Sequence, residues 1–513
     1  MLCESDWEVH YELSLRTFEA CAQAQYVIGQ HDGALVSLSA IFAHAKSFED
    51  QLESYCTLLN CLGEKDKLTE AVSKSLGVLA RLGEPLPAEP TQTDIMTEVG
   101  AAKALMSETS PAQIVSMPEM TDKKKLAAMK LCYYLTYHAF LGHQQLLAVI
   151  LPRMIQISLK YGMSPMSAVA FGAFGVFAAA YGKYEEAVGL ARISTALLDR
   201  FGDRPVYLAR VYASVQSSIY SFTEPIQSTV LALEKGYTVG MASGDLNGCF
   251  SCVSMKHLLQ IQSGHFELGA LAAEMSGSIQ EMRKHSSHLN MTLPTYQAAL
   301  NLSIETGEDL TLLSGSAMNQ EELLQRAREL RQPNVESFII FFRMWLGYLF
   351  GRYELAAEMA EQRREISKVR PLRGGSFVSE IFYSGLVAVL MAKRNDPGEW
   401  KEIVAESIAT FSSLAATSET NFRHKLRLLE AENLYYLCND CDAAAFAYEE
   451  AINLAGERGF INDQALACER AGVFYSEMGD SSTASQHFHN AHTYYLAWGA
   501  ANKAKDVLIR HLN

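Results

Sequence analysis

Two Cys-x-x-Cys pairs are the residues whose spacing points most directly to chemistry. Cys249 and Cys252 form the first pair, and Cys438 and Cys441 form the second, 186 residues further along. Four thiolates in tetrahedral geometry are common ligands of a structural zinc ion. The fold would have to bring such distant pairs together. A redox or metal role for Cys438 and Cys441 alone is the alternative, although neither pair lies in a thioredoxin-like setting.

Three histidines near the end of the chain are a second candidate metal site. His489 and His492 are three residues apart and share one face of a helix, whereas His487 lies off that face. No carboxylate completes a helical metal-binding motif. We therefore interpret the three as surface histidines, and we expect no metal and no cofactor.

Motifs for nucleotide or acyl chemistry are missing from the sequence. A phosphate-binding loop reads Gly-x4-Gly-Lys-Ser/Thr, but here Gly182-Lys183 is followed by Tyr184 and lacks the upstream glycine. The sequence contains no His-Arg-Asp or Asp-Phe-Gly kinase motif, no Gly-x-Ser-x-Gly and no His-Glu-x-x-His. The sequence predicts a protein that is not an enzyme.

Composition and charge narrow the choice of partners and location. The formal net charge is −15 over 513 residues, which argues against nucleic acid, because phosphate binding needs a concentrated basic surface. Ten scattered cysteines and a polar N-terminus favour a cytoplasmic protein with reduced thiols. Residues 131–152 and 161–182 lack charged side chains and are long enough to span a bilayer. His138, His143 and Pro165 within them favour buried helices, so we expect no membrane span.

A repeated trio of small, aromatic and small residues indicates which elements carry these side chains. Ala444, Tyr448 and Ala451 have the same spacing as Ala484, Phe488 and Ala491, 40 residues later. This pattern is typical of the second helix in a helical hairpin of tetratricopeptide (TPR) type. Small residues let the two helices approach closely, and the aromatic ring fills the space between them.

The same pattern can be followed upstream at intervals of about 37 to 44 residues. Its expected small residues are Ala34, Ala71, Ala187, Gly269, Ala356, Ala444 and Ala484. Glycine accepts a left-handed backbone and therefore commonly ends a helix. We expect the preceding helices to end at Gly29, Gly182, Gly264, Gly351 and Gly479.

These repeats predict an all-α fold, a TPR-like superhelix of roughly twelve degenerate helical hairpins. We expect one continuous array over residues 1–513. Possible subdivisions are 1–120, 121–304 and 305–513, with the clearest TPRs at 421–500. Breaks in the helical pattern are expected at 84–90, 305–320 and 371–375.

The expected solenoid bears on the candidate sites. Distant repeats of a solenoid are not expected to touch, so the two cysteine pairs should not form one zinc site. Some TPR grooves hold the C-terminal carboxylate of a partner with lysine and asparagine from the first helices. Alignment to the TPR consensus puts Asn433 and Arg470 at groove-facing positions, with Leu429 where the lysine would stand.

Segments along nearly the whole chain resemble one family region. It is the TPR-like region of large multidomain signalling ATPases, which carry in order a serine/threonine kinase-like domain, a STAND/AAA-type ATPase, the helical region, a GAF domain and a sensor histidine kinase. The similar segments are Asp6-Trp7-Glu8, Met117-Pro118, Thr121-Asp122, Ala317-Met318-Asn319, Asn421-Phe422-Arg423-His424-Lys425, Tyr448-Glu449-Glu450-Ala451 and Trp498-Gly499-Ala500.

The resemblance implies a regulatory region between a nucleotide switch and a signalling output. The catalytic residues of those proteins have no counterparts here, so the chain is a stand-alone remnant, a fragment of a larger gene or an excised region. We expect a non-catalytic scaffold that binds a protein partner or an adjacent ATPase or kinase domain. The alternative is a ligand-sensing solenoid that binds a small molecule and biases a switch domain.

Overall fold

The computed structural model describes residues 4–65, 67–202, 204–285, 289–330, 332–369, 376–394 and 398–512. Within these ranges every extended regular element is helical, and one isolated β-bridge joins Glu119 and Met163. The prediction of an all-helical chain is confirmed. None of the described helices is long and apolar enough to cross a membrane.

The α-helices are, in chain order, α1 (Glu4–Val9), α2 (Tyr11–Val27), α3 (His31–His44), α4 (Leu52–Glu64), α5 (Leu68–Arg81), α6 (Gln92–Ser107), α7 (Pro111–Ser116), α8 (Lys123–Gly142), α9 (Gln144–Tyr161), α10 (Pro165–Ala180), α11 (Tyr184–Arg200), α12 (Leu208–Ser218), α13 (Ile226–Ser243), α14 (Leu246–Ser263), α15 (Leu268–His285), α16 (Leu289–Ser303), α17 (Gln320–Glu329), α18 (Pro333–Leu349), α19 (Tyr353–Val369), α20 (Phe377–Arg394), α21 (Gly398–Thr417), α22 (Glu419–Tyr436), α23 (Cys441–Glu457), α24 (Ile461–Glu477), α25 (Ser481–Trp498) and α26 (Ala501–Val507). Short 3-10 helices are η1 (Glu49–Gln51), η2 (Pro205–Tyr207) and η3 (Tyr220–Phe222), and a π-helical turn, η5 (Leu508–Leu512), follows α26.

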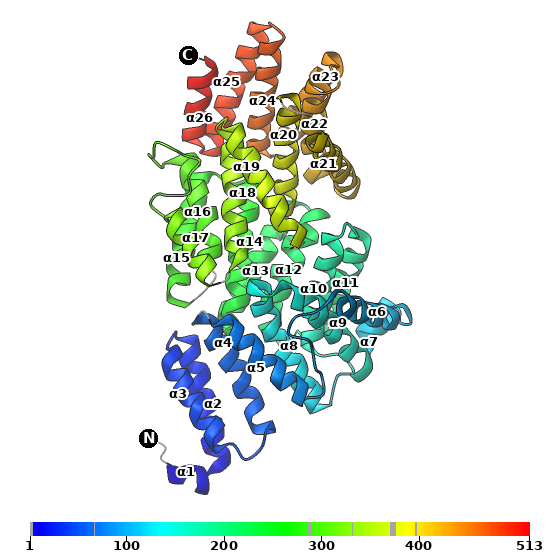
Figure 1. The fold of residues 1–513 in the computed structure, drawn as a ribbon, viewed down its shortest axis with the longest axis vertical. Helices are drawn as coiled ribbons and strands as arrows, with labels where there is room; N and C mark the ends of the chain where they lie inside the picture. Colours follow the sequence, from blue (N-terminus) through cyan, green and yellow to red (C-terminus); the bar gives the residue numbers. More distant parts are fainter. Residues whose placement is uncertain are drawn as a thin grey trace.

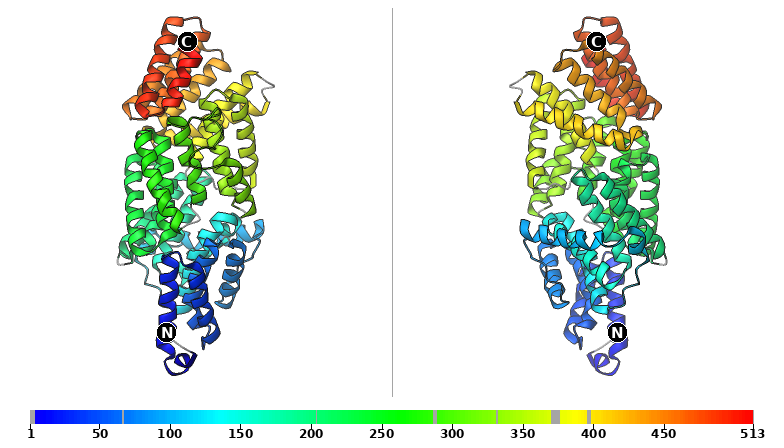
Figure 2. Two further views of the ribbon diagram at one scale, coloured as in Figure 1. Left: turned by 90° about the vertical axis from the view of Figure 1, so that its left-hand side faces the viewer. Right: turned by 90° about the vertical axis from the view of Figure 1, so that its right-hand side faces the viewer.

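The helices form an elongated body with the two termini at opposite ends (Figure 1). Helices that follow one another in sequence pack as pairs, most extensively α10 with α11, α22 with α23 and α24 with α25. Two side views show the N-terminal helices tapering at one end and α22 to α26 forming the other (Figure 2). This pairing is consistent with a helical repeat.

Most of the small residues expected from the repeat occupy one structural position. Six of the seven are the fourth residue of their helix, and none of these six is more than 3% exposed. They are Ala34, Ala71, Ala187, Ala356, Ala444 and Ala484. Gly269 was a wrong choice, because it is exposed and Leu271 occupies the fourth position of α15. Helix α15 begins four residues after Gly264, whereas α19 begins two residues after Gly351, and this insertion shifts the register.

The predicted turn glycines all have the left-handed backbone that motivated their choice. Their φ angles are 78° at Gly29, 73° at Gly182, 67° at Gly264, 70° at Gly351 and 85° at Gly479. A side chain there would strain the backbone. Glycine is therefore favoured at these five turns, whereas Asn439 has the left-handed backbone, with φ 57°, at the turn after α22.

The expected interruptions also fall between helices. No helix occupies residues 82–91, and the Thr91 hydroxyl and Asp94 carboxylate form a capping box at the start of α6. Asp122 accepts hydrogen bonds from the Lys124 and Lys125 amides at the start of α8. Residues 304–319 separate α16 from α17. The break expected at 371–375 lies outside the described residues.

Three asparagines join segments about 200 residues apart in sequence. The side-chain amides of Asn421, Asn462 and Asn502 each donate to a carbonyl oxygen on an earlier helix, at offsets of 200, 200 and 201 residues. The acceptors lie at Ser221, Gln262 and Asn301, at distances of 3.2, 3.0 and 3.0 Å. Helix ends leave carbonyls without intrahelical donors, and these amides satisfy some of them.

The constant offset means that a later stretch of the chain runs over an earlier one in register. The expectation that distant repeats do not touch is therefore wrong. Side-chain amides on α22, α24 and α26 thus meet carbonyl oxygens of η3, α14 and α16.

Simultaneous replacement of Asn421, Asn462 and Asn502 by alanine should lower the free energy of unfolding by about 3 kcal/mol. Each site loses a buried or partly buried hydrogen bond of about 1 kcal/mol, and separated sites add. Chemical denaturation measures the change. Asn433→Ala, on the half-buried Asn433 outside these contacts, should change stability by less than about 0.5 kcal/mol. A triple variant as stable as the wild type would contradict this role.

Candidate functional site

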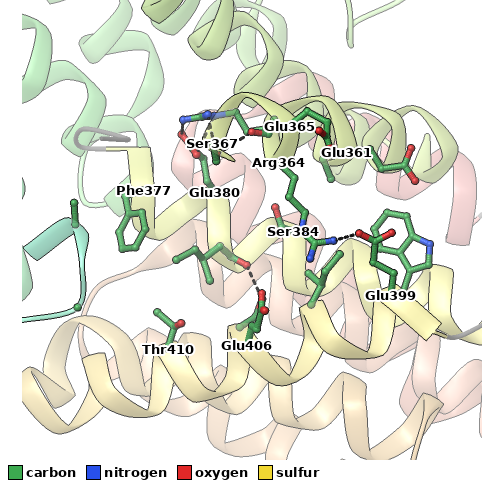
Figure 3. A pocket seen from close by; sticks show the side chains of 18 of the residues that line it. Glu361, Arg364, Glu365, Ser367, Phe377, Glu380, Ser384, Glu399, Glu406 and Thr410 are labelled. Carbon is green, nitrogen blue, oxygen red and sulfur yellow. Dashed lines mark hydrogen bonds and ion pairs between the residues drawn. The ribbon is translucent and has the colours of Figure 1, made fainter. Parts of the chain in front are cut away.

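A groove with charged walls lies between α19, α20 and α21. Its volume is about 580 Å³, and the turn between α10 and α11 closes one end with Tyr181, Gly182 and Tyr184. Glu361 and Glu365 lie four residues apart on one face of α19, and Glu399 and Glu406 lie on α21. Figure 3 shows these carboxylates on the two walls with Ser384 of α20 between them.

The groove has an excess of negative charge. Five glutamates line it against two arginines, Arg363 and Arg364. Arg363 is buried and pairs with Glu380 across 3.0 Å, so this pair forms a neutral floor. Arg364 pairs with Glu399 and bridges the two walls (Figure 3). Within the described residues, Glu361 and Glu406 make no ion pair and stay exposed.

Aromatic side chains accompany the carboxylates. Tyr181 is 64% exposed at the rim, and Trp400 and Phe377 are partly exposed in the lining. Aromatic faces attract cations, and exposed carboxylates pair with lysine and arginine. The arrangement can therefore hold a cationic segment with interspersed apolar side chains.

No sequence motif predicts this groove. Its residues come from three helices, and no short motif contains them. The available signal was the acidic spacing of Glu361 with Glu365 and of Glu399 with Glu406, which places each pair near one helix face.

Arg470, predicted to face a groove, is buried in an ion pair. Its Nε and Nη2 lie 2.8 and 2.9 Å from the two carboxylate oxygens of Glu432, and the two residues are 3% and 0% exposed. Asn433 follows Glu432 and is half-buried, with Nδ2 3.6 Å from Cys438 Sγ. Leu429 is buried. The Arg470 guanidinium is thus occupied by Glu432, and the proposed clamp for a partner's carboxylate is not assembled by these residues.

The three histidines are separated by their surroundings. His487 is buried, so its interpretation as a surface histidine is wrong. Its ring stacks on Tyr475 at 5.2 Å, its Nε2 lies 3.2 Å from Glu449, and burial lowers its pKa. His489 is exposed and its Nδ1 lies 2.8 Å from the Ser485 carbonyl oxygen. The ring of Tyr475 on α24 covers the ring of His487 on α25, and this contact explains why His487 is buried.

The two cysteine pairs differ in environment. Cys249 and Cys252 are buried in α14, where burial raises the pKa of both thiols and Cys252 Sγ lies 3.0 Å from the Ala209 carbonyl oxygen. Cys438 is exposed and Cys441 half-buried at the turn before α23. Among the described residues, no group of three or more His, Cys, Asp or Glu side chains is placed to hold a metal ion.

No protein-family model matches the sequence, and no curated protein matches it.

Proposed function

We propose that the chain is a non-catalytic scaffold, a TPR-like superhelix of roughly twelve hairpins, that docks a basic segment of a protein partner. The acidic groove between α19 and α21 carries the proposal. The pairing of neighbouring helices, the recurrent buried alanine and the 200-residue offset between contacting segments support the superhelical interpretation.

The chemistry of the partner follows from the groove. Glu361 and Glu406 stand on opposite walls and carry unpaired charge, and Tyr181 and Trp400 add aromatic surface to the same groove. A segment rich in lysine or arginine with interspersed leucine or phenylalanine satisfies both features. An adjacent ATPase or kinase domain of a signalling protein is one source of such a segment, in line with the family resemblance.

Reversing the charge of both unpaired carboxylates should weaken peptide binding. The Glu361→Lys/Glu406→Lys variant should raise the Kd of a fluorescein-labelled 12-residue Lys/Leu/Phe peptide about tenfold, because two favourable charge contacts become repulsive. Fluorescence anisotropy at low ionic strength measures this. Salt should weaken wild-type binding, because the contacts are exposed.

The control variant is Glu358→Lys/Glu402→Lys, which makes the same charge change on the same two helices at exposed positions outside the groove lining. At an ionic strength of about 0.15 M, where the Debye length is about 8 Å, its Kd should rise less than that of the groove variant, because its charges do not contact the peptide. Equal weakening in both variants would show non-specific attraction. Equal binding of a peptide with glutamate in place of lysine would contradict the proposed partner chemistry.

A further inference from the structure

A second, largely apolar cavity lies in the middle of the molecule, apart from the acidic groove. Its volume is about 180 Å³, and it is lined by α8, α9, α10, α12, α14 and α16. Most of its wall is hydrocarbon, including Leu147, Leu151, Val169, Phe177 and Met255. A dry cavity of about 150 Å³ is large enough for benzene. The space therefore accepts one aromatic ring or a short alkyl chain.

The charge of Arg210, a residue of this lining, is directed to groups that lie outside it. Arg210 Nη1 donates to the Tyr133 carbonyl oxygen at 2.8 Å, and Nη2 lies 3.6 Å from Asp245 Oδ1. Neither Tyr133 nor Asp245 belongs to the residues that line the cavity. The guanidinium is thus engaged elsewhere. A charged ligand would leave water without gaining a counterion, which is costly, so the cavity favours a neutral ligand.

One wall carries hydroxyl groups whose protons are already engaged. Ser214 and Ser218 lie four residues apart and share one face of α12. The Ser214 hydroxyl donates to the Arg210 carbonyl oxygen at 3.0 Å. Ser217 donates to a backbone carbonyl oxygen at 2.5 Å, so Ser218 is the donor in the 3.1 Å contact between the hydroxyls of Ser217 and Ser218. Ser214 and Ser218 therefore offer a ligand lone pairs rather than protons.

We propose that this cavity binds a neutral compound of about one aromatic ring or about six carbons that carries one hydroxyl group, a phenol or an alcohol. The hydroxyl of the ligand donates to the oxygen of Ser214 or Ser218, and its hydrocarbon lies against α9, α10 and α14. Burial of the apolar body supplies the affinity, and the hydroxyl supplies the selectivity. This site is independent of the docking role of the acidic groove, and its ligand suits the ligand-sensing alternative.

Three one-ring compounds test the proposal on the full chain by calorimetry. Phenol should bind with a Kd at least about threefold lower than fluorobenzene, which has nearly the same size and no hydroxyl donor. A cavity without usable acceptors would give the opposite order, because phenol would lose its hydrogen bonds to water on entering it. Benzylamine, which is charged at neutral pH, should bind at least about tenfold more weakly than phenol. Equal or weaker binding of phenol than of either compound would overturn the assigned ligand class.

Filling the cavity locates the binding. Ala173 lies on the cavity wall of α10, and Ala173→Phe should abolish the binding of phenol and of fluorobenzene, because the larger side chain occupies their space. Ala101→Phe, at an exposed alanine of α6, should leave both affinities unchanged. Unchanged phenol binding in Ala173→Phe would overturn the assignment to this cavity.

Removing the acceptors tests the role of the hydroxyl groups. Ser214→Ala/Ser218→Ala should abolish or reverse the preference for phenol over fluorobenzene, and continued binding of fluorobenzene reports an intact cavity. The matched control is Ser39→Ala/Ser412→Ala, because both serines are exposed and donate, like Ser214, to the carbonyl oxygen four residues earlier. This control should keep the wild-type preference. An unchanged preference in Ser214→Ala/Ser218→Ala would overturn the role of these acceptors.

Discussion

Glu432→Ala should lower the free energy of unfolding of the C-terminal hairpins by about 3 to 5 kcal/mol. Glu432 is fully buried and holds Arg470 through two hydrogen bonds of 2.8 and 2.9 Å. It also accepts from the Tyr448 hydroxyl at 2.7 Å. Removal of the carboxylate leaves a buried guanidinium without its counterion, which is the costly case for a buried ion pair.

Urea denaturation, with native-state hydrogen exchange of α22 to α25, measures the loss. Glu432→Leu/Arg470→Met should recover much of it, because replacing both charges leaves no unpaired ion. Glu457→Ala, at an exposed glutamate of α23, should change stability by less than about 0.5 kcal/mol. A Glu432→Ala protein within 1 kcal/mol of the wild type, by the same comparison, would contradict a structural role for the pair.

The second large effect is a loss of stability in mild acid caused by His138. This side chain of α8 is 1% exposed, and neither ring nitrogen has a hydrogen-bond partner. Burial, with a smaller contribution from the charge of Arg210, lowers the pKa of His138 to about 3. In the unfolded chain a histidine has a pKa near 6.5.

Proton binding by His138 in the unfolded chain makes the folded protein less stable as the pH falls. Below a pH of about 6.5 the unfolded chain binds a proton that the folded protein rejects until a pH of about 3. The stability from neutral His138 is therefore complete above a pH of about 6.5 and decreases as the pH falls. At about 1.4 kcal/mol per pH unit, the loss between pH 7 and pH 4 is about 3 kcal/mol.

His138→Leu should remove this component, so its unfolding free energy should vary less with pH between about pH 6.5 and pH 4. His489→Leu, at an exposed histidine of α25, should keep the wild-type slope. Urea denaturation at several pH values gives both slopes. Identical slopes for His138→Leu and the wild type would contradict a lowered pKa of His138 in the folded protein.

The helical repeat could be predicted from the sequence because each hairpin needs the same small residues and turn glycines at the same positions. Ala444 and Ala484 sit at the same helix position, and Gly351 and Gly479 end helices with the same backbone angle class. Each of these requirements acts within one hairpin, so the sequence carries it directly. Gly269 failed because an insertion after Gly264 changed the spacing on which the pattern depends.

Features that depend on contacts between distant segments were not predictable in this way. The pairing of Asn462 with the Gln262 carbonyl links helices 200 residues apart. Arg470 matched a groove position by repeat alignment, but the carboxylate that occupies it lies 38 residues earlier, at Glu432. Lys425 and Asp463 pair with the same offset. Oppositely charged residues 38 positions apart could have predicted these ion pairs, because that spacing places the two partners on the first helices of neighbouring hairpins.

Carboxyl footprinting of the acidic groove tests the central claim most directly. The full chain is labelled with a carbodiimide and an amine, with and without saturating Lys/Leu/Phe peptide, and modification is read by mass spectrometry. The account predicts that the peptide reduces labelling of Glu361 and Glu406 severalfold and leaves the exposed Glu358 and Glu402 unchanged. Equal protection of all four residues, or protection of none, would contradict docking of a basic segment in this groove.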